Sequence, residues 1–149
     1  MTYDALRRGR CSLAGYAYHV TVVTAGRQPV FADFESARLA IREMRRCDAT
    51  AQTKTLAWVL MPDHLHWLFV LGVQASLGRL IHDFKGRSAL RLNRHRRTAG
   101  PLWQRAYHDH AVRNDEDVHT IARYIVANPL RAGLVEKIGQ YPHWDATWL

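Results

Sequence analysis

Strand-like patterns of apolar residues occupy four parts of the 149-residue chain. Residues 15–24 are rich in β-branched and aromatic side chains and predict a first strand. Two apolar runs, 55–60 and 64–71, are separated by Met61-Pro62-Asp63, and Pro followed by Asp suits the corner of a short turn, so they predict a hairpin. Residues 103–113 alternate between apolar and polar positions and predict a fourth strand.

Helix-like patterns separate these strands. The first covers 34–47, the second runs from the N-capping Ser76 to about Arg94, and the third lies between a cap at Asn114 or Asp115 and Pro129. This order of elements predicts an α+β fold of the ferredoxin-like split βαβ type. We expect an antiparallel sheet of about four to five strands with helices mainly on one face.

The sequence pattern also indicates the domain organisation. The sequence contains no internal repeat, low-complexity segment or linker, so residues 1–149 predict a single domain. Residues 136–149 are rich in aromatic side chains and predict a C-terminal tail that lies across the domain or projects to a partner.

The amino-acid composition indicates which kind of partner the protein binds. The formal net charge is +8 and the isoelectric point is about 10.1, which favours nucleic acid first and an anionic membrane surface second. No apolar stretch approaches the length that spans a bilayer, and no signal-peptide core follows the basic residues Arg7, Arg8 and Arg10, so we expect a cytoplasmic protein. Cys11 and Cys47 are too far apart for a metal knuckle and are expected to be reduced thiols.

Two histidines in the second hairpin strand stand out from their apolar neighbours. Alternation directs His64, His66, Leu68 and Val70 to one face of the strand. Two imidazoles at this spacing can share one metal ion, although polar surface residues would give the same pattern. A histidine-triad nucleotide hydrolase would need a third histidine where Leu68 stands, and a closed zinc site would need four protein ligands.

Five short sequence motifs occur in order between residues 13 and 145, and one of them contains the histidine pair. They are YHVT (18–21), MPDHLHWLF (61–69), FKGR (84–87), LWQRAYHDH (102–110) and YIVANPLRAGLV (124–135). Together they resemble the REP-associated tyrosine transposases, relatives of the IS200/IS605 single-tyrosine transposases within the HUH endonucleases.

The resemblance implies roles for individual residues. His64 and His66 would hold Mg²⁺ or Mn²⁺, and Tyr124, on the C-terminal helix, would be the nucleophile that attacks the DNA backbone. Asn128, one helical turn after the tyrosine, would be the third metal ligand, with Asp63 as its rival. Other candidates for the nucleophile are Tyr16, Tyr18 and Tyr107, but the motif around Tyr124 favours Tyr124. Arg123 or Arg131 could favour ionisation of its phenol.

A basic surface would bind the DNA. Its candidate residues are Lys85, Arg87, Arg91, Arg94, Arg96 and Arg97. Trp103 and Tyr107 could stack on unpaired bases, although aromatic residues in a strand also pack in cores. His19 faces either the DNA or the sheet, and the sequence does not decide between them.

The predicted function is metal-dependent cleavage and strand transfer of single-stranded DNA at palindromic hairpins, through a covalent 5′-phosphotyrosine. Two alternatives remain open from the residues. One is a noncatalytic, domesticated DNA-binding protein, and the other is a metal-dependent nucleotide or RNA hydrolase that uses water. Either a monomer or a homodimer is compatible with the helix pattern.

Overall fold

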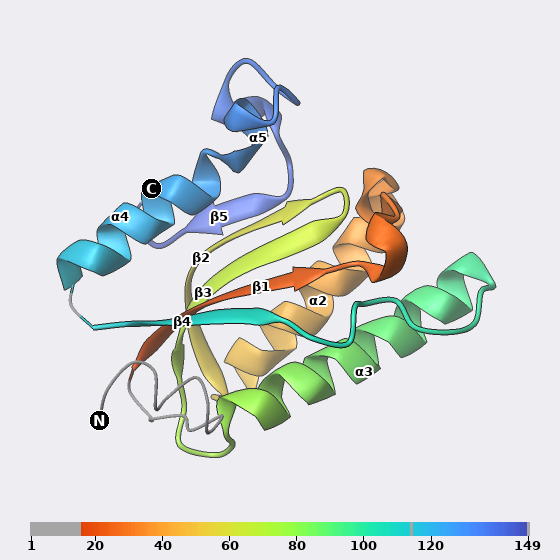
Figure 1. Ribbon diagram of the computed structural model, residues 1–149, viewed down its shortest axis with the longest axis horizontal. Coiled ribbons are helices and arrows are strands. Elements are labelled where there is room, and N and C mark those ends of the chain that lie inside the picture. Colours follow the sequence, from red (N-terminus) through yellow and green to blue (C-terminus); the bar gives the residue numbers. More distant parts are fainter. Residues whose placement is uncertain (1–15, 114, 149) are drawn as a thin grey trace.

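The computed structural model describes residues 16–113 and 115–148 and contains a five-stranded antiparallel sheet (Figure 1). The strands are β1 (Ala17–Val23), β2 (Thr53–Met61), β3 (His64–Leu71), β4 (His108–Val112) and β5 (Trp144–Ala146). Their order in the sheet is β4-β1-β3-β2-β5, so the first four strands form the split βαβ arrangement. The predicted α+β, ferredoxin-like fold is confirmed.

The three long helices begin where the sequence predicts, and a short fourth helix follows them. They are α2 (Phe34–Ala49), α3 (Leu77–Arg96), α4 (Asp115–Val126) and the short α5 (Asn128–Arg131), with 3₁₀ turns η1 (Ala25–Arg27), η2 (Val30–Ala32) and η3 (Ile138–Gln140). The side chain of Asp33 accepts a hydrogen bond from the Ser36 amide at the start of α2, and Ser76 accepts from the Arg79 amide at the start of α3. None of the helices within the described residues could cross a membrane.

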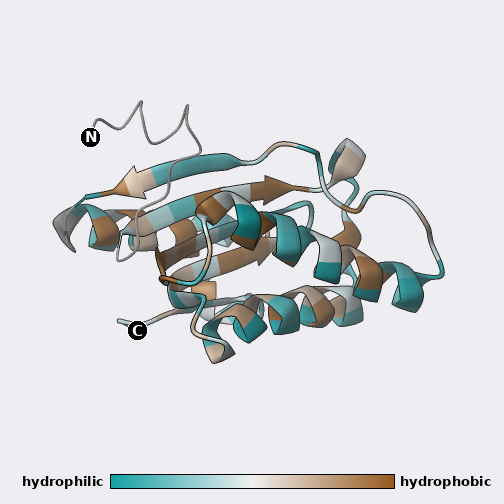
Figure 2. Ribbon diagram, turned by 90° about the horizontal axis from the view of Figure 1, so that it is seen from below, coloured by the Kyte–Doolittle hydropathy of each residue, from teal (hydrophilic) through white to brown (hydrophobic). Residues whose placement is uncertain are grey.

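Helices α2 and α3 cover one face of the sheet, which we call the sealed face. Leu65, Trp67, Phe69 and Leu71 of β3 all point into it. The Trp67 ring packs against Phe69 and against Phe84 of α3, with centroid distances of 4.5 Å and 5.4 Å. In Figure 2, brown hydrophobic residues run through the inner strands and recur along the helices between teal hydrophilic ones.

Helix α4 packs on the opposite face, which we call the open face (Figure 1). Val118, Ala122 and Ile125 of α4 are buried against β2 and β3, where they meet Val59 and Leu68. Helix α4 makes its strand contacts with β2, β3 and β5, so the polar half of this face, on β1 and β4, receives less cover from it. Two of the three long helices therefore share one face, and α4 brings its tyrosine to the other.

The predicted strand over 103–113 is wrong in its first half. The regular strand is limited to 108–112; before it, Trp103 forms an isolated bridge with Thr24, and the Gln104 amide donates to the Val23 carbonyl at 2.8 Å. The Lys85 ammonium donates to the carbonyl oxygens of residues 104, 105 and 106, at 2.8, 3.0 and 3.4 Å. Trp103 is only 5% exposed, and its indole N–H donates to the Ser88 hydroxyl at 2.9 Å. Its placement in the core corrects the prediction that Trp103 stacks on DNA bases.

The C-terminal residues lie along the edge of the sheet. Strand β5 pairs with β2, and the Tyr141 hydroxyl donates to the Leu60 carbonyl. The Thr147 amide donates to the Leu56 carbonyl at 2.8 Å. The segment thus extends the sheet by one strand.

The buried thiol of Cys47 is free, and burial raises its pKa. Cys11 and the N-terminal arginines Arg7, Arg8 and Arg10 lie outside the described residues.

Candidate active site

The β2–β3 hairpin positions the histidine pair. Pro62 and Asp63 form its turn, so β3 opens directly on His64, and the two-residue repeat of the strand places His66 on the same face. The two imidazole rings lie edge to face with centroids 5.0 Å apart. His64 Nδ1 lies 2.6 Å from Asp63 Oδ1, which leaves His64 Nε2 as the nitrogen available to a ligand.

His66 is held from the neighbouring strand. Its Nδ1 lies 3.0 Å from His19 Nε2 and 3.1 Å from Thr21 Oγ1, both on β1. Both contacts engage Nδ1 of His66 and not its Nε2. The sequence could not decide the direction of His19, and it gave no signal for Thr21, because both contacts depend on the register that pairs Thr21 with His66.

Burial keeps the inner imidazoles neutral. It lowers the pKa of His66 to about 3, with further contributions from His19, His64 and Arg131. Burial and the nearby His110 lower the pKa of His19 to about 4. A neutral imidazole has a lone pair for a metal ion, so His66 is in the protonation state that a ligand needs at neutral pH.

Tyr124 projects from the last turn of α4 beside the histidines. Its ring centroid is 6.5 Å from that of His66, and the side chain is 54% exposed. Tyr18 is 1% exposed in the core of the sealed face, and Tyr107 packs against that same core. Tyr124 is thus the tyrosine that the fold places both beside the histidine pair and within reach of a large substrate.

Arg131 lies directly over this tyrosine. Its guanidinium carbon is 3.9 Å from the Tyr124 ring centroid, and its Nη2 donates to the Tyr124 carbonyl at 2.7 Å. The short helix α5, which the sequence analysis did not predict, brings Arg131 back toward α4. Arg123, the other arginine considered beside the tyrosine, is exposed on α4.

The nitrogen and oxygen atoms around the histidine pair suit a divalent cation that keeps some coordination positions free for substrate or water. Asn128 donates its amide N–H to the Ile125 carbonyl at 3.1 Å, which leaves the amide oxygen as its acceptor atom. Asp63 lies on the Nδ1 side of His64, and its other carboxylate oxygen pairs with Arg27 at 3.2 Å. Within the described part of the chain, no three His, Cys, Asp or Glu side chains form a metal-binding group. Asn128 and Asp63 each keep an oxygen atom that could serve as a third protein ligand.

The predicted basic residues divide into two groups. Arg87 and Arg91 pair with the buried Glu43 at 3.2 and 3.3 Å, and Lys85 bonds to backbone carbonyls. Arg94, Arg96 and Arg97 are exposed at the C-terminal end of α3. This second group, at one end of the helix, is the part of the basic cluster that is most accessible to DNA.

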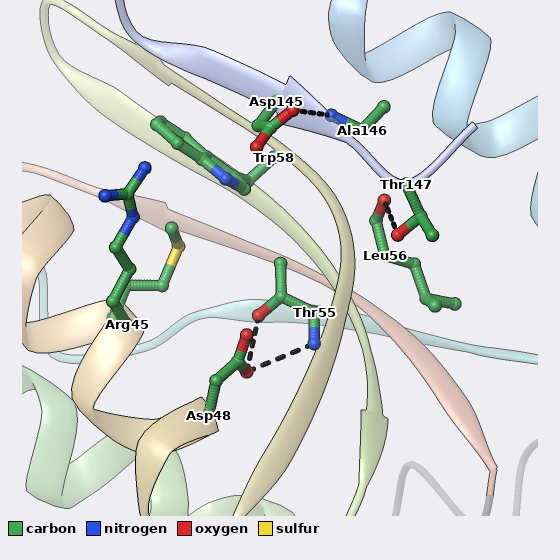
Figure 3. Close-up of a pocket in the computed structure, with 9 residues that line it drawn as sticks. Arg45, Asp48, Thr55, Leu56, Trp58, Asp145, Ala146 and Thr147 are labelled. Carbon is green, nitrogen blue, oxygen red and sulfur yellow. Dashed lines mark hydrogen bonds between the residues drawn. The ribbon is translucent and has the colours of Figure 1, made fainter. Parts of the chain in front are cut away.

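A pocket of about 150 Å³ lies elsewhere, between α2 and the β2–β5 edge (Figure 3). Asp48 on its wall already accepts hydrogen bonds from the Thr55 amide and hydroxyl, at 3.1 and 2.8 Å. The pocket is lined from α2, β2 and the C-terminal segment and includes neither the histidine pair nor Tyr124, so we assign it no part in the site.

Comparison with known sequences decides the family. The sequence model of the family described as IS200-like transposase matches residues 12–128. The chain belongs to this family. Among IS200-like transposases it is similar to the REP-associated tyrosine transposase of Escherichia coli K12, with 28% identity over 88 residues, covering 58% of this chain and 50% of that protein. A second relative, assigned to the same group in Haemophilus influenzae, is 28% identical over 100 residues, covering 60% of this chain and 57% of that protein. The chain thus spans about half the length of these relatives.

Solved structures show that this IS200-like chain shares their fold. A REP-associated tyrosine transposase bound to a REP hairpin superimposes with a TM-score of 0.75 and 20% identity, covering 90% of this chain and 78% of that one. A transposase from Deinococcus radiodurans R1 gives a TM-score of 0.56 and 24% identity, covering 73% and 87%.

Proposed function

We propose that this chain cleaves and rejoins single-stranded DNA at hairpins, with Tyr124 as the nucleophile and His64 and His66 as ligands of Mg²⁺ or Mn²⁺. The observation that carries the proposal is the meeting of β3 and α4 on the open face, where ring centroids are 5.0 Å apart within the histidine pair and 6.5 Å apart between His66 and Tyr124. A metal-binding pair next to an exposed phenol fits phosphoryl transfer to tyrosine.

Tyr124 would supply the attacking oxygen. The bond from its phenolic oxygen to phosphorus forms while the bond from phosphorus to the 3′ oxygen breaks. The phenol loses its proton and the departing 3′ oxygen gains one, which leaves a 5′-phosphotyrosine and a free 3′-OH. Because the phosphotyrosine conserves the phosphodiester, attack by a 3′-OH can rejoin the strand without another energy source. A bound Mg²⁺ or Mn²⁺ supplies stabilisation of the charge on the nonbridging oxygens.

Arg131 would prepare the tyrosine. Its contact with the ring face would restrict the rotation of Tyr124, and its positive charge beside the ring would help to hold the negatively charged phosphate. The amide oxygen of Asn128, in the residue that begins α5, would complete the metal ligands.

The DNA would approach from the hairpin end of the sheet. His95 near the end of α3 lies 3.6 Å from Asp33, and the neighbouring Phe31 amide donates to the Pro62 carbonyl in the hairpin turn at 2.9 Å. These contacts put the exposed arginines of α3 at the same end as the turn before His64. The relative bound to a REP hairpin supports a hairpin as the substrate.

A covalent-trapping experiment tests the proposal. The protein is incubated with labelled single-stranded hairpin DNA and Mn²⁺ and run on a denaturing gel. We expect a protein–DNA adduct that is lost in Tyr124→Phe while DNA binding persists. Tyr16→Phe is the matched control, since Tyr16 is also an exposed tyrosine (40% exposed) but lies before β1, and it should keep the adduct.

The same gel separates the alternatives. Cleavage by the wild-type protein without an adduct would identify a hydrolase that uses water. Binding without cleavage would identify a noncatalytic DNA-binding protein.

A further inference from the structure

Two imidazoles meet behind the proposed metal-binding edge of His66. His19 Nε2 lies 3.0 Å from His66 Nδ1, and the ring centroids are 5.2 Å apart. At this distance one of the two nitrogens carries the shared proton and the other accepts it. The antiparallel register of β1 and β3, which pairs Thr21 with His66, creates the contact by placing His19 diagonally across from His66.

The two directions of this hydrogen bond have opposite consequences. If His19 Nε2–H donates, His66 Nδ1 is the acceptor, and neutral His66 then carries its proton on Nε2, where it blocks a metal ion. If His66 Nδ1–H donates, its Nε2 has a free lone pair. Only the second arrangement of protons makes His66 a ligand.

We propose that His19 is a positioning residue of the metal site, which accepts the Nδ1–H of His66 and so keeps His66 Nε2 unprotonated and oriented toward the cation. This inference rests on the proposed function, since it takes His66 as a ligand. Metal-bound histidines usually donate their second N–H to such an acceptor, which fixes the tautomer and strengthens the ligand.

The neighbouring contacts support this assignment. Asp63 lies 2.6 Å from His64 Nδ1, so each histidine of the pair has its own partner on the Nδ1 side. Thr21 Oγ1 is 3.1 Å from His66 Nδ1, but an imidazole nitrogen is far more basic than a hydroxyl oxygen. His19 is therefore the acceptor that most favours a proton on His66 Nδ1.

Mn²⁺ binding by the full chain without DNA tests the proposal. The dissociation constant is measured by titration calorimetry or electron paramagnetic resonance at pH 7.5. In His19→Phe we expect it to rise roughly 10- to 100-fold, as for other lost partners of metal-bound histidines. His19→Gln should restore the affinity to within about threefold of wild type, because its amide oxygen can accept from His66. His108→Phe is the control, an exposed histidine on β4 opposite Thr21, and it should leave the affinity unchanged.

Failure of this inference and failure of the proposed metal site give different results. If His66→Ala binds Mn²⁺ as tightly as wild type, His66 is not a ligand and the proposed metal site is wrong. If His66→Ala loses Mn²⁺ while His19→Phe keeps wild-type affinity, only the role of His19 is overturned. A His19→Gln variant that binds as weakly as His19→Phe would also overturn it.

A spectroscopic measurement addresses the proton directly. Nitrogen-15 NMR of the imidazoles, with saturating Mg²⁺, reports which ring nitrogen is protonated. We expect a proton on His66 Nδ1 and none on His19 Nε2. A protonated His19 Nε2 in the Mg²⁺-bound protein would contradict the proposal even if the Phe variant failed to fold.

Discussion

The sealed and open faces are built from alternating residues of the same strands, yet they hold different kinds of side chain. In β3, Trp67 and Phe69 enter a closed aromatic core under α2 and α3. One residue away, His64 and His66 emerge on the open face, where α4 packs mainly along β2 and β3. A single eight-residue strand therefore serves the core with one set of residues and the candidate site with the other.

This difference shows how the fold can hold reactive groups without weakening its core. The sealed face supplies most of the large buried side chains, so the open face can contain imidazoles that bond to one another. The strand backbone, held rigid by the sealed face, fixes the spacing of the histidine pair. Stability and chemistry should then respond separately to substitution.

The largest expected effects come from exchanging one residue on each face of β3. Trp67→Ala should lower the free energy of unfolding by about 3–5 kcal/mol, because it opens a cavity among fully buried rings. His64→Ala should change it by less than about 1 kcal/mol yet reduce DNA cleavage by roughly a thousandfold or more. Urea unfolding and the cleavage assay measure the two quantities. Cleavage by His64→Ala at saturating Mn²⁺ would contradict the separation of the two faces.

Much of this comparison could be predicted from the sequence, because local signals determine it. The alternation in 64–71 assigns each side chain to a face, and the Pro62–Asp63 turn fixes where the strand begins. The capping residues Asp33 and Ser76 likewise mark helix starts through bonds to amides three residues away. Such features need no knowledge of distant contacts.

The remaining features depend on pairing between distant segments. Residues 103–107 alternate like a strand. In the structure, however, the Lys85 ammonium donates hydrogen bonds to the carbonyls of 104–106, and Trp103 is buried in the core. The role of His19 depends on the register between β1 and β3. The spacing of apolar residues in α2 likewise does not predict that Phe34 is 56% exposed. Long-range register and tertiary hydrogen bonds therefore limit what the sequence predicts.

A sharper test compares one arginine from each face. Arg131→Leu should slow cleavage roughly 10- to 100-fold, because Tyr124 loses the positive charge over its ring. Arg87→Leu should leave the rate within about twofold but lower the free energy of unfolding by about 1–2 kcal/mol, since the buried Glu43 loses a partner. Cleavage rates and urea unfolding of both variants measure this. Weaker DNA binding by Arg87→Leu, with unchanged stability, would instead place Arg87 on the DNA surface.

The smallest expected effect concerns the histidine that closes the edge of the sealed face. His143 is 5% exposed between Phe34 and Tyr141, and its Nδ1 has no hydrogen-bond partner among the described residues. Burial, and then the positive charge of Arg38 on α2, lower its pKa below the ordinary value of 6.5. The folded state therefore resists protonation of His143, whereas the unfolded chain accepts a proton near pH 6.5.

The sign of the pH dependence follows from this difference. The stabilisation from neutral His143 is complete above pH 6.5 and is lost as the pH falls from 6.5 toward the lowered pKa, by at most about 1.4 kcal/mol per pH unit. In His143→Gln the free energy of unfolding should fall less steeply between pH 6.5 and 5, measured by urea unfolding at each pH. The buried imidazoles of the open face titrate in both proteins, so the difference between the two slopes isolates His143. Equal slopes would mean that His143 can be protonated in the folded protein. Water would then reach the edge of the sealed face next to β5.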